Sequence, residues 1–234
     1  MSNLFRKSLI VLGLILSCLT TVSYASNTAI GGVSLGVTRV IYPIDAKQVS
    51  LPVINHSKND RYLINSWIET DYQKKSKDFL ITPPLFVAEA NTENTLRIVN
   101  VANNLPFDRE SVFWVNVKSI PSVNKEDLES KNLLQLAVLS RIKLFVRPND
   151  LPYKSEKALE MISFEKGSNG IVVDNKSPYF ISFVNVYIGD KKQPNVMAAP
   201  FEKTTISSVF GKNFSYQTVN DFGGLTPKTE INLH

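Results

Sequence analysis

The chain has 234 residues, of which 43% are hydrophobic and 20% charged, and its formal net charge is +5. This length is enough for one large all-β domain or for two domains of ordinary size. The positive charge is weak and scattered, which argues against nucleic acid as a partner.

The first 25 residues have the pattern of a cleavable secretory leader. Arg6 and Lys7 form a basic start, the apolar run "SLIVLGLILSCL" follows, and "SYA" supplies the small residues of a cleavage site. The alternative is a membrane anchor, but a spanning helix needs roughly 20 apolar residues and this run is shorter. Cleavage after Ala25 removes Cys18, the only cysteine, and leaves 209 residues with a net charge of +3. The mature chain therefore has no disulfide and relies on its core.

Short alternating runs predict the strands of a first domain. They are rich in β-branched and aromatic residues, and clusters of Asn, Asp, Pro and Ser separate them, as in an antiparallel sandwich. The proline pair Pro83-Pro84 interrupts one run. In chain order the predicted strands lie within residues 33–43, 48–57, 61–71, 78–91, 94–103, 110–121 and 133–145.

A second, smaller domain follows a boundary between residues 147 and 158, where two prolines and several charges interrupt the pattern. Further strands are predicted within residues 161–167, 170–177, 179–189, 204–211 and 228–234. No long helical period competes with these strands. We therefore expect an all-β protein with two immunoglobulin-like β-sandwich domains, at residues 26–148 and 149–234.

Residues suited to catalysis are scarce. His56 lies in the polar turn "NHSKND", where we interpret it as a solvated loop residue, and the other histidine is the terminal His234. The chain has no G-x-S-x-G elbow, no P-loop and no metal-ligand spacing. We interpret the glycosylation sequons at Asn55, Asn175 and Asn213 as pattern matches only. The sequence favours a binding protein over an enzyme, with no cofactor and no metal.

The stretch "LLQLAVLSRIKLF", residues 133–145, is too apolar for an ordinary surface strand. Alternation places two apolar sets on opposite faces. One face carries Leu134, Leu136 and Val138. The other carries Leu133, Ala137 and Leu139. Two cations, Arg141 and Lys143, follow. As a pattern alone, this stretch is typical of a central core strand.

Several motifs resemble those of one family. "LPFDRESVFWVNVKSIP" (105–121), followed by "LSRIKLFVRP" (139–148), resembles the PapD-like periplasmic chaperones of the chaperone–usher pathway, which assemble pili. "VSLGVTRVIYP", "ITPPLF" and "NDFGG" (220–224) match other segments of that family in the same order. The short connection at residues 121–132 and the lack of a cysteine near it are similar to the short-loop subfamily. The resemblance implies a periplasmic protein whose two sandwiches meet at an angle, as a boomerang, with a cleft between them.

The resemblance also implies a function. Such chaperones bind, fold and cap fimbrial subunits by donor-strand complementation and deliver them to an outer-membrane usher. The resemblance assigns Leu134, Leu136 and Val138 to the groove of the subunit. Ala137 and Leu139, on the opposite face, are expected in the chaperone's own core. An exposed apolar strand promotes aggregation, so we expect the free chaperone to shield it, for instance by self-association.

The same resemblance implies two roles for charged residues. Arg39 and Lys143 are expected to bind the C-terminal carboxylate of the subunit through charge-assisted hydrogen bonds. Strict alternation puts Lys143 on the face opposite the donor residues, which a twist or bulge near Ser140 would change. Arg141 is the competing cation. Three further residues match an interdomain ion network that fixes the angle between the domains: Glu110, Arg147 and Asp221.

The alternative is a secreted immunoglobulin-like adhesin or pilus subunit. A pilus subunit should carry an alternating N-terminal donor extension and usually a disulfide. The chain has no convincing extension before Val33, and it has no cysteine after the leader.

Overall fold

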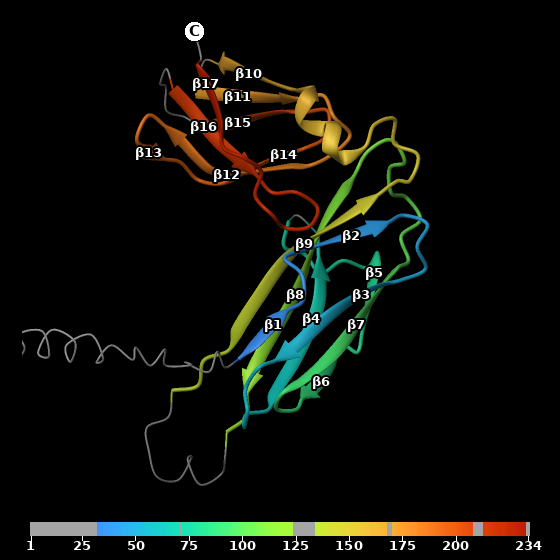
Figure 1. Cartoon of the computed structure of the whole chain (residues 1–234). Helices are drawn as coiled ribbons and strands as arrows, with labels where there is room; N and C mark the ends of the chain where they lie inside the picture. The colour runs from blue at the N-terminus through green and yellow to red at the C-terminus, as the bar shows by residue number, and fades with distance from the viewer. Residues whose placement is uncertain (1–31, 71, 124–133, 168–169, 208–212, 233–234) are drawn as a thin grey trace, which may run out of the picture. The chain divides into compact units, whose positions relative to one another are not determined.

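The computed structural model describes residues 32–70, 72–123, 134–167, 170–207 and 213–232. The predicted leader at residues 1–25 and most of the connection at residues 121–132 lie outside this part. The described residues form strands almost throughout, with one short 3-10 helix, η1 (Ser155–Met161) (Figure 1). None of the helices in these ranges combines the length and apolar character needed to cross a membrane. The predicted all-β fold is confirmed.

The first sandwich has a four-stranded and a five-stranded sheet. The smaller sheet has the order β1-β3-β7-β5, formed by Val33–Leu35, Val49–Asn55, Thr92–Asn100 and Phe79–Thr82. The larger sheet has the order β2-β9-β8-β4-β6, formed by Arg39–Pro43, Val138–Arg147, Ser111–Pro121, Tyr62–Glu69 and Leu85–Ala88. Alternate residues of both sheets are buried in one core, which includes Leu51, Ile64, Leu96, Val115 and Leu144.

The second sandwich is smaller. One sheet has the order β10-β11-β15, formed by Ile162–Gly167, Gly170–Asn175 and Lys203–Ser207. The other has the order β13-β12-β16-β17, formed by Lys191–Lys192, Ile181–Ile188, Asn213–Thr218 and Thr229–Asn232, and β14 (Val196–Ala198) pairs with β12. An aromatic cluster packs in its core: Phe164, Phe183, Phe214 and Tyr216 form five ring pairs with centroids 5.1–6.0 Å apart.

The run predicted as one strand at residues 33–43 is two strands. β1 pairs antiparallel with β3 in one sheet, whereas β2 pairs parallel with β9 in the other. The prediction of a single strand in a purely antiparallel sandwich is therefore wrong here. The chain changes sheet after Gly36, whose N–H donates to the carbonyl of Pro52 at 3.0 Å. A Cβ at Gly36 would lie 2.9 Å from the Cβ of Pro52, so this close approach suits glycine.

The same Asn-x-Ser turn ends an internal strand in each sandwich. In the first, Asn55 is buried, and its Oδ1 accepts a hydrogen bond from the Ser57 N–H at 3.0 Å. Its Nδ2 donates to three carbonyl oxygens, those of Asp60, Ala88 and Glu89. One amide side chain thus satisfies backbone groups from two separate stretches of chain, residues 57–60 and 88–89.

In the second sandwich, Asn175 repeats this arrangement. Its Oδ1 accepts from the Ser177 N–H at 3.1 Å. Its Nδ2 donates to the carbonyl oxygens of Tyr179, Ala198 and Ala199. Two of the three sequons are therefore buried structural turns. The third asparagine, Asn213, is exposed.

We expect Asn175→Ala to lower the free energy of unfolding by roughly 2–4 kcal/mol, because it leaves several buried backbone groups without a partner. Urea-induced unfolding checks this. Asn213→Ala removes a sequon at an exposed position and is the matched control, expected to change the midpoint little. Equal effects of the two substitutions would contradict the structural role of Asn175.

Candidate functional site

The two faces of β9 have different environments. Ile142, Leu144 and Val146 pack in the core of the first sandwich. Because side chains alternate along a strand, four residues share the opposite face: Arg141, Lys143, Phe145 and Arg147. Phe145 is buried yet belongs to neither hydrophobic core, and its ring centroid lies 5.9 Å from that of Phe180 in the second sandwich. This face of β9 therefore meets the second sandwich.

Arg39 and Lys143 are direct partners in the parallel ladder between β2 and β9. Nη1 of Arg39 donates to the carbonyl oxygen of Val219 at 3.0 Å, and Nζ of Lys143 donates to Oγ of Ser182 at 2.8 Å. Both acceptors are uncharged. Within the described part of the chain, no ion pair includes either cation. The ladder thus places two positive charges without an ion-pair partner side by side.

Burial makes this pair of charges costly. Removal from water and, to a smaller extent, repulsion from Arg39 together lower the pKa of Lys143 to about 8. Burial also lowers the pKa of Arg39, although Asp221 and Glu110 oppose that change. Nε of Arg39 is buried and has no hydrogen-bond partner among the described residues. A bound anion would relieve both the repulsion and the unsatisfied donor.

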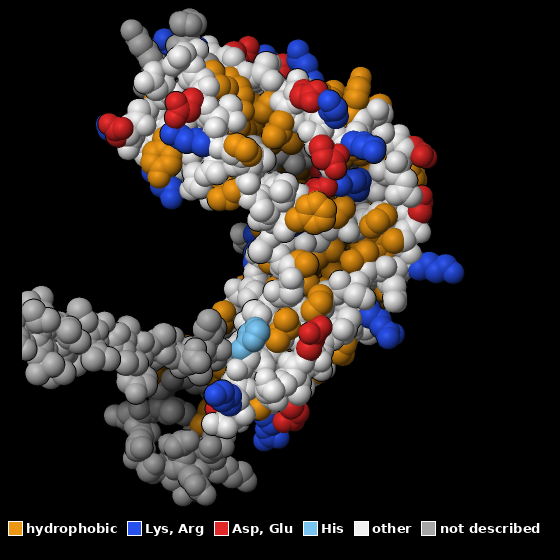
Figure 2. Space-filling view, in the orientation of Figure 1, with side chains coloured by type: hydrophobic (Ala, Val, Ile, Leu, Met, Phe, Trp, Pro, Cys, Tyr) orange, Lys and Arg blue, Asp and Glu red, His pale blue; other side chains and the backbone are white. Residues whose placement is uncertain are grey.

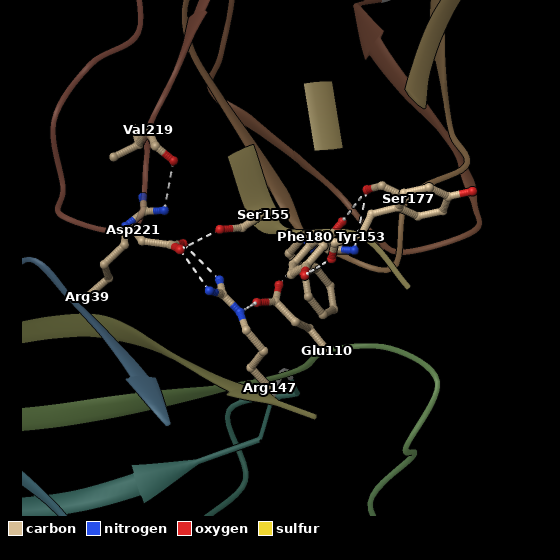
Figure 3. Close-up of polar contacts among 10 residues, drawn as sticks. Arg39, Glu110, Arg147, Tyr153, Ser155, Ser177, Phe180, Val219 and Asp221 are labelled. Carbon is tan, nitrogen blue, oxygen red and sulfur yellow. Dashed lines mark hydrogen bonds and ion pairs between the residues drawn. The ribbon is translucent and has the colours of Figure 1, made fainter. Parts of the chain in front are cut away.

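The structure brings Glu110, Arg147 and Asp221 together (Figure 3). Nε of Arg147 donates to Glu110 Oε1 at 2.7 Å, and its two terminal nitrogens donate to the carboxylate of Asp221 at 2.7 and 2.8 Å. Two more donors complete the cluster, because the Phe180 N–H reaches Glu110 Oε2 and the Ser155 hydroxyl reaches Asp221 Oδ2. Glu110 and Arg147 belong to the first sandwich, and the other three residues follow Arg147 in the second.

Each charge of this cluster has a partner of opposite sign, and the cluster as a whole carries a net charge of −1. Burial alone would lower the pKa of Arg147, but its hydrogen bonds and ion pairs with both carboxylates raise the pKa above its ordinary value. Burial alone would raise the pKa of Asp221, but Arg147 and Ser155 lower it. Burial raises the pKa of Glu110, and Arg147 and the Phe180 N–H limit the rise. Arg147 is thus the cation with carboxylate partners, in contrast to Arg39 and Lys143.

Arg141 has its own partner. Its Nε lies 3.5 Å from Glu69 Oε2, and its guanidinium stacks 3.9 Å from the centroid of the Trp114 ring. The Trp67 indole N–H also donates to Glu69, at 2.8 Å. The structure therefore separates the two competing cations: Arg141 is paired on its own sheet, and Lys143 is not.

The three proposed donor residues are exposed. Leu134 is 80%, Leu136 67% and Val138 58% accessible to solvent, and other large hydrophobic side chains also reach the surface, with charged groups between them (Figure 2). β9 begins at Val138. Leu134 and Leu136 therefore precede the strand.

The expectation that Ala137 and Leu139 belong to the core is wrong, because both are exposed. Leu139 lies on the same face of β9 as Arg141 and Lys143, opposite the core residues Leu144 and Val146, and Ala137 precedes the strand. The suggested bulge near Ser140 is also wrong, since the ladder between β8 and β9 runs without a register shift from Val138 to Val146. Leu133 lies outside the described residues.

Comparison with known proteins decides the family. Residues 32–152 match the PapD N-terminal domain, described as a pili and flagellar-assembly chaperone domain, and residues 157–230 match the PapD C-terminal domain of pili assembly chaperones. The chain belongs to the PapD family of pili assembly chaperones. It is 49% identical over 213 residues to the probable fimbrial chaperone SfmC of Escherichia coli K12, covering 90% of this chain and 92% of SfmC.

Solved structures of PapD-family chaperones have the same fold. The periplasmic chaperone SfaE is 42% identical, with a TM-score of 0.75 over 85% of this chain and 98% of SfaE. The SafB chaperone of Salmonella enterica, solved in complex with the SafA pilin, is 28% identical, with a TM-score of 0.77 over 88% of this chain and 98% of SafB.

Sequence reasoning did not find the uncharged partners of this chaperone's charged residues. Ser182, Val219, Ser155 and the Phe180 N–H all lie in the second sandwich, far along the chain from the residues they contact. A serine or a backbone group carries no charge or spacing signal that links it to a distant arginine. The stretch around Trp114 carries one of the family motifs, but the stacking of the Trp114 ring with Arg141 was not predicted.

We expect Arg147→Ala to lower the free energy of unfolding by about 3–5 kcal/mol, because it leaves Glu110 and Asp221 partly buried without a counter-charge. The exposed Lys191 gives the control, Lys191→Ala. Urea unfolding of both variants beside the wild type tests the prediction. Equal midpoints for the two variants would count against a stabilising ion cluster.

We expect Lys143→Met to stabilise the free chaperone by about 1–2 kcal/mol at pH 7, although it removes the hydrogen bond to Ser182. The folded-state pKa of about 8 lies below the ordinary value of 10.5, so the charged lysine opposes folding below pH 8. Between about pH 8 and 10.5 the wild type should gain stability relative to the variant. Unfolding midpoints of the variant and the wild type, measured from pH 6 to 10, check this prediction. A stability advantage of the variant that grows with pH would contradict it.

Proposed function

We propose that this pilus-assembly chaperone binds a fimbrial subunit through one continuous stretch, residues 134–143. Its exposed apolar side chains would enter the groove of the subunit, and its basic end would bind the subunit's C-terminal carboxylate. One observation carries the proposal: Lys143 and Arg39 are adjacent, partly buried and without an ion-pair partner among the described residues. Lys143 lies five positions beyond the exposed Val138.

The carboxylate site consists of Arg39 and Lys143. A terminal carboxylate is an anion with two acceptor oxygens, so it can accept hydrogen bonds from both cations at once. Partial burial makes this interaction stronger than that of a surface ion pair. Binding would also hold Lys143 in its charged form. The pairing of Arg141 with Glu69 supports Lys143 as the second member of the site.

The donor residues are Leu134, Leu136 and Val138. Each contributes on the order of 1.5–3 kcal/mol when a subunit buries it. A strand advances about 3.3 Å per residue, so Val138 lies roughly 16–17 Å from Lys143 along β9. An anchored carboxylate at one end therefore determines which pocket of the groove each apolar side chain reaches. The unbroken β8–β9 ladder keeps this spacing constant.

The remaining assignments support this role. Glu110, Arg147 and Asp221 hold the two domains together as a structural network, and the domain boundary falls at residues 148–149. Residues 1–25 act as a leader that is cleaved on export to the periplasm, where the loaded chaperone delivers subunits to an outer-membrane usher. The free chaperone shields its apolar strand by self-association. The function is binding and not catalysis. The family assignment disfavours the alternative, a secreted adhesin or pilus subunit.

We expect Leu136→Glu to remain folded and to lose capture of a co-expressed pilin subunit, because Leu136 is exposed in the free chain and buried only in the complex. Leu144→Glu is the matched control, the same change on the same stretch. Leu144 is fully buried, so this variant should unfold. Thermal unfolding and co-purification of the pilin decide the outcome. A folded Leu136→Glu variant that captures the pilin normally would refute the donor assignment.

The carboxylate site is tested in the same assay. Arg39→Ala and Lys143→Met should both remain folded and fail to retain the pilin. A pilin extended by one glycine keeps a terminal carboxylate but moves it by one residue, and it should be retained poorly by the wild type. Full retention of the pilin by both folded variants would refute the site.

A further inference from the structure

A pocket adjoins Arg39 on the side of the ion cluster. Its volume is about 290 Å³, and its walls come from both sandwiches. Arg39 and Phe145 belong to its wall in the first sandwich, whereas Leu159, Phe180 and Phe222 belong to its wall in the second. Aromatic and aliphatic side chains form much of the lining. The ion cluster closes one side, because Glu110, Arg147 and Asp221 also line the pocket.

The charges around the pocket specify the kind of occupant. Arg147 and its two carboxylates together carry a net charge of −1, and Glu156 also lines the pocket, so this side offers nothing to an anion. Arg39 has no ion-pair partner among the described residues, and Lys143 stands beside it. A complementary ligand therefore carries a negative charge at the Arg39 edge and an apolar group beyond it. The last residue of a peptide chain has this form when its side chain is hydrophobic, because carboxylate and side chain share one Cα.

The size of the pocket agrees with a single residue. Pockets for whole small ligands have volumes of roughly 300–1,000 Å³, and this pocket lies at the bottom of that range. It has room for one large side chain and not for a folded segment. Phe145 stacks under the Arg39 guanidinium, with 5.6 Å between the guanidinium carbon and the ring centroid, so the charged edge and the apolar wall are in direct contact.

Phe222 at the pocket combines an exposed side chain with a backbone turn that is held by hydrogen bonds. It is 96% accessible to solvent, yet the turn that carries it is held firmly. The Asn220 side chain accepts hydrogen bonds from the N–H groups of Phe222 and Gly224. Gly223 has φ +83°, and a Cβ there would lie 2.1 Å from Oγ1 of Thr38, the neighbour of Arg39. An exposed aromatic side chain on a turn whose backbone is already fixed can contact a partner with less loss of backbone entropy than one on a loose loop.

We infer that this pocket, with Phe222 at its edge, binds the hydrophobic side chain of the subunit's last residue, so that the chaperone reads the identity of that residue as well as its carboxylate. This inference rests on the proposed function, because Arg39 and Lys143 must hold the carboxylate first. It adds a specificity element that is separate from the donor residues of β9.

Small acids test the pocket without a subunit. The probes are N-acetyl-L-phenylalanine, N-acetylglycine and N-acetyl-L-phenylalaninamide, titrated into the full mature chain and followed by NMR chemical shifts. We expect the phenylalanine acid to bind about tenfold tighter than the glycine acid, as burial of a large apolar side chain predicts. In Phe222→Ala, this preference should fall below threefold. Because Phe222 is exposed, the variant should unfold at the wild-type temperature.

The outcomes separate the two proposals. Equal binding of the phenylalanine acid and its amide would refute the carboxylate site itself. Stronger binding of the acid than of the amide, without preference for phenylalanine over glycine, would refute only the pocket. A preference that survives unchanged in Phe222→Ala, or no binding of the phenylalanine acid at all, would also overturn the inference. Lys143→Met should weaken both acids by a similar factor and keep the preference.

Discussion

Two cations that repel each other are held side by side because the parallel ladder between β2 and β9 pairs Arg39 with Lys143. The backbone imposes this proximity, and among the described residues no carboxylate forms an ion pair with either cation. The arrangement depends on the change of sheet after Gly36, because a strand that stayed beside β3 would carry Arg39 away from β9. The site is thus a consequence of topology, formed by residues whose mutual interaction is unfavourable in the free protein.

The contrast with Arg147 shows how one strand face serves two purposes. Arg147 lies four residues beyond Lys143, and its carboxylate partners stabilise the contact between the sandwiches. Lys143 and Arg39 instead keep their charge available for a ligand. Natural proteins commonly accept a less stable arrangement where function needs it. Here the two groups lie next to each other on one strand. The stabilising ion cluster can therefore offset the stability that the repulsion between Arg39 and Lys143 costs.

Alternation along short runs was sufficient to predict the all-β fold, the two sandwiches and the break at Pro83-Pro84, which separates β5 from β6. These features depend on local patterns. The division of residues 33–43 between two sheets was not predictable, because it depends on the contact between Gly36 and Pro52. The exposure of Ala137 and Leu139 was not predictable either, because it depends on where β9 begins and on which of its faces meets the core. Resemblance, rather than pattern, brought Arg39, Lys143 and the three members of the ion cluster together.

The Asn-x-Ser turns have a consequence for producing this protein in a eukaryotic secretory host. Such a host attaches glycans to sequons on the nascent chain. A glycan on Asn55 or Asn175 would replace one hydrogen of an amide that donates to three carbonyl groups inside a closed turn. The modified chain could not complete either sandwich. Among the three sequons, only Asn213, on an exposed position of β16, is compatible with a sugar. In that host, the yield of folded protein would therefore depend on whether folding buries Asn55 and Asn175 before they are glycosylated.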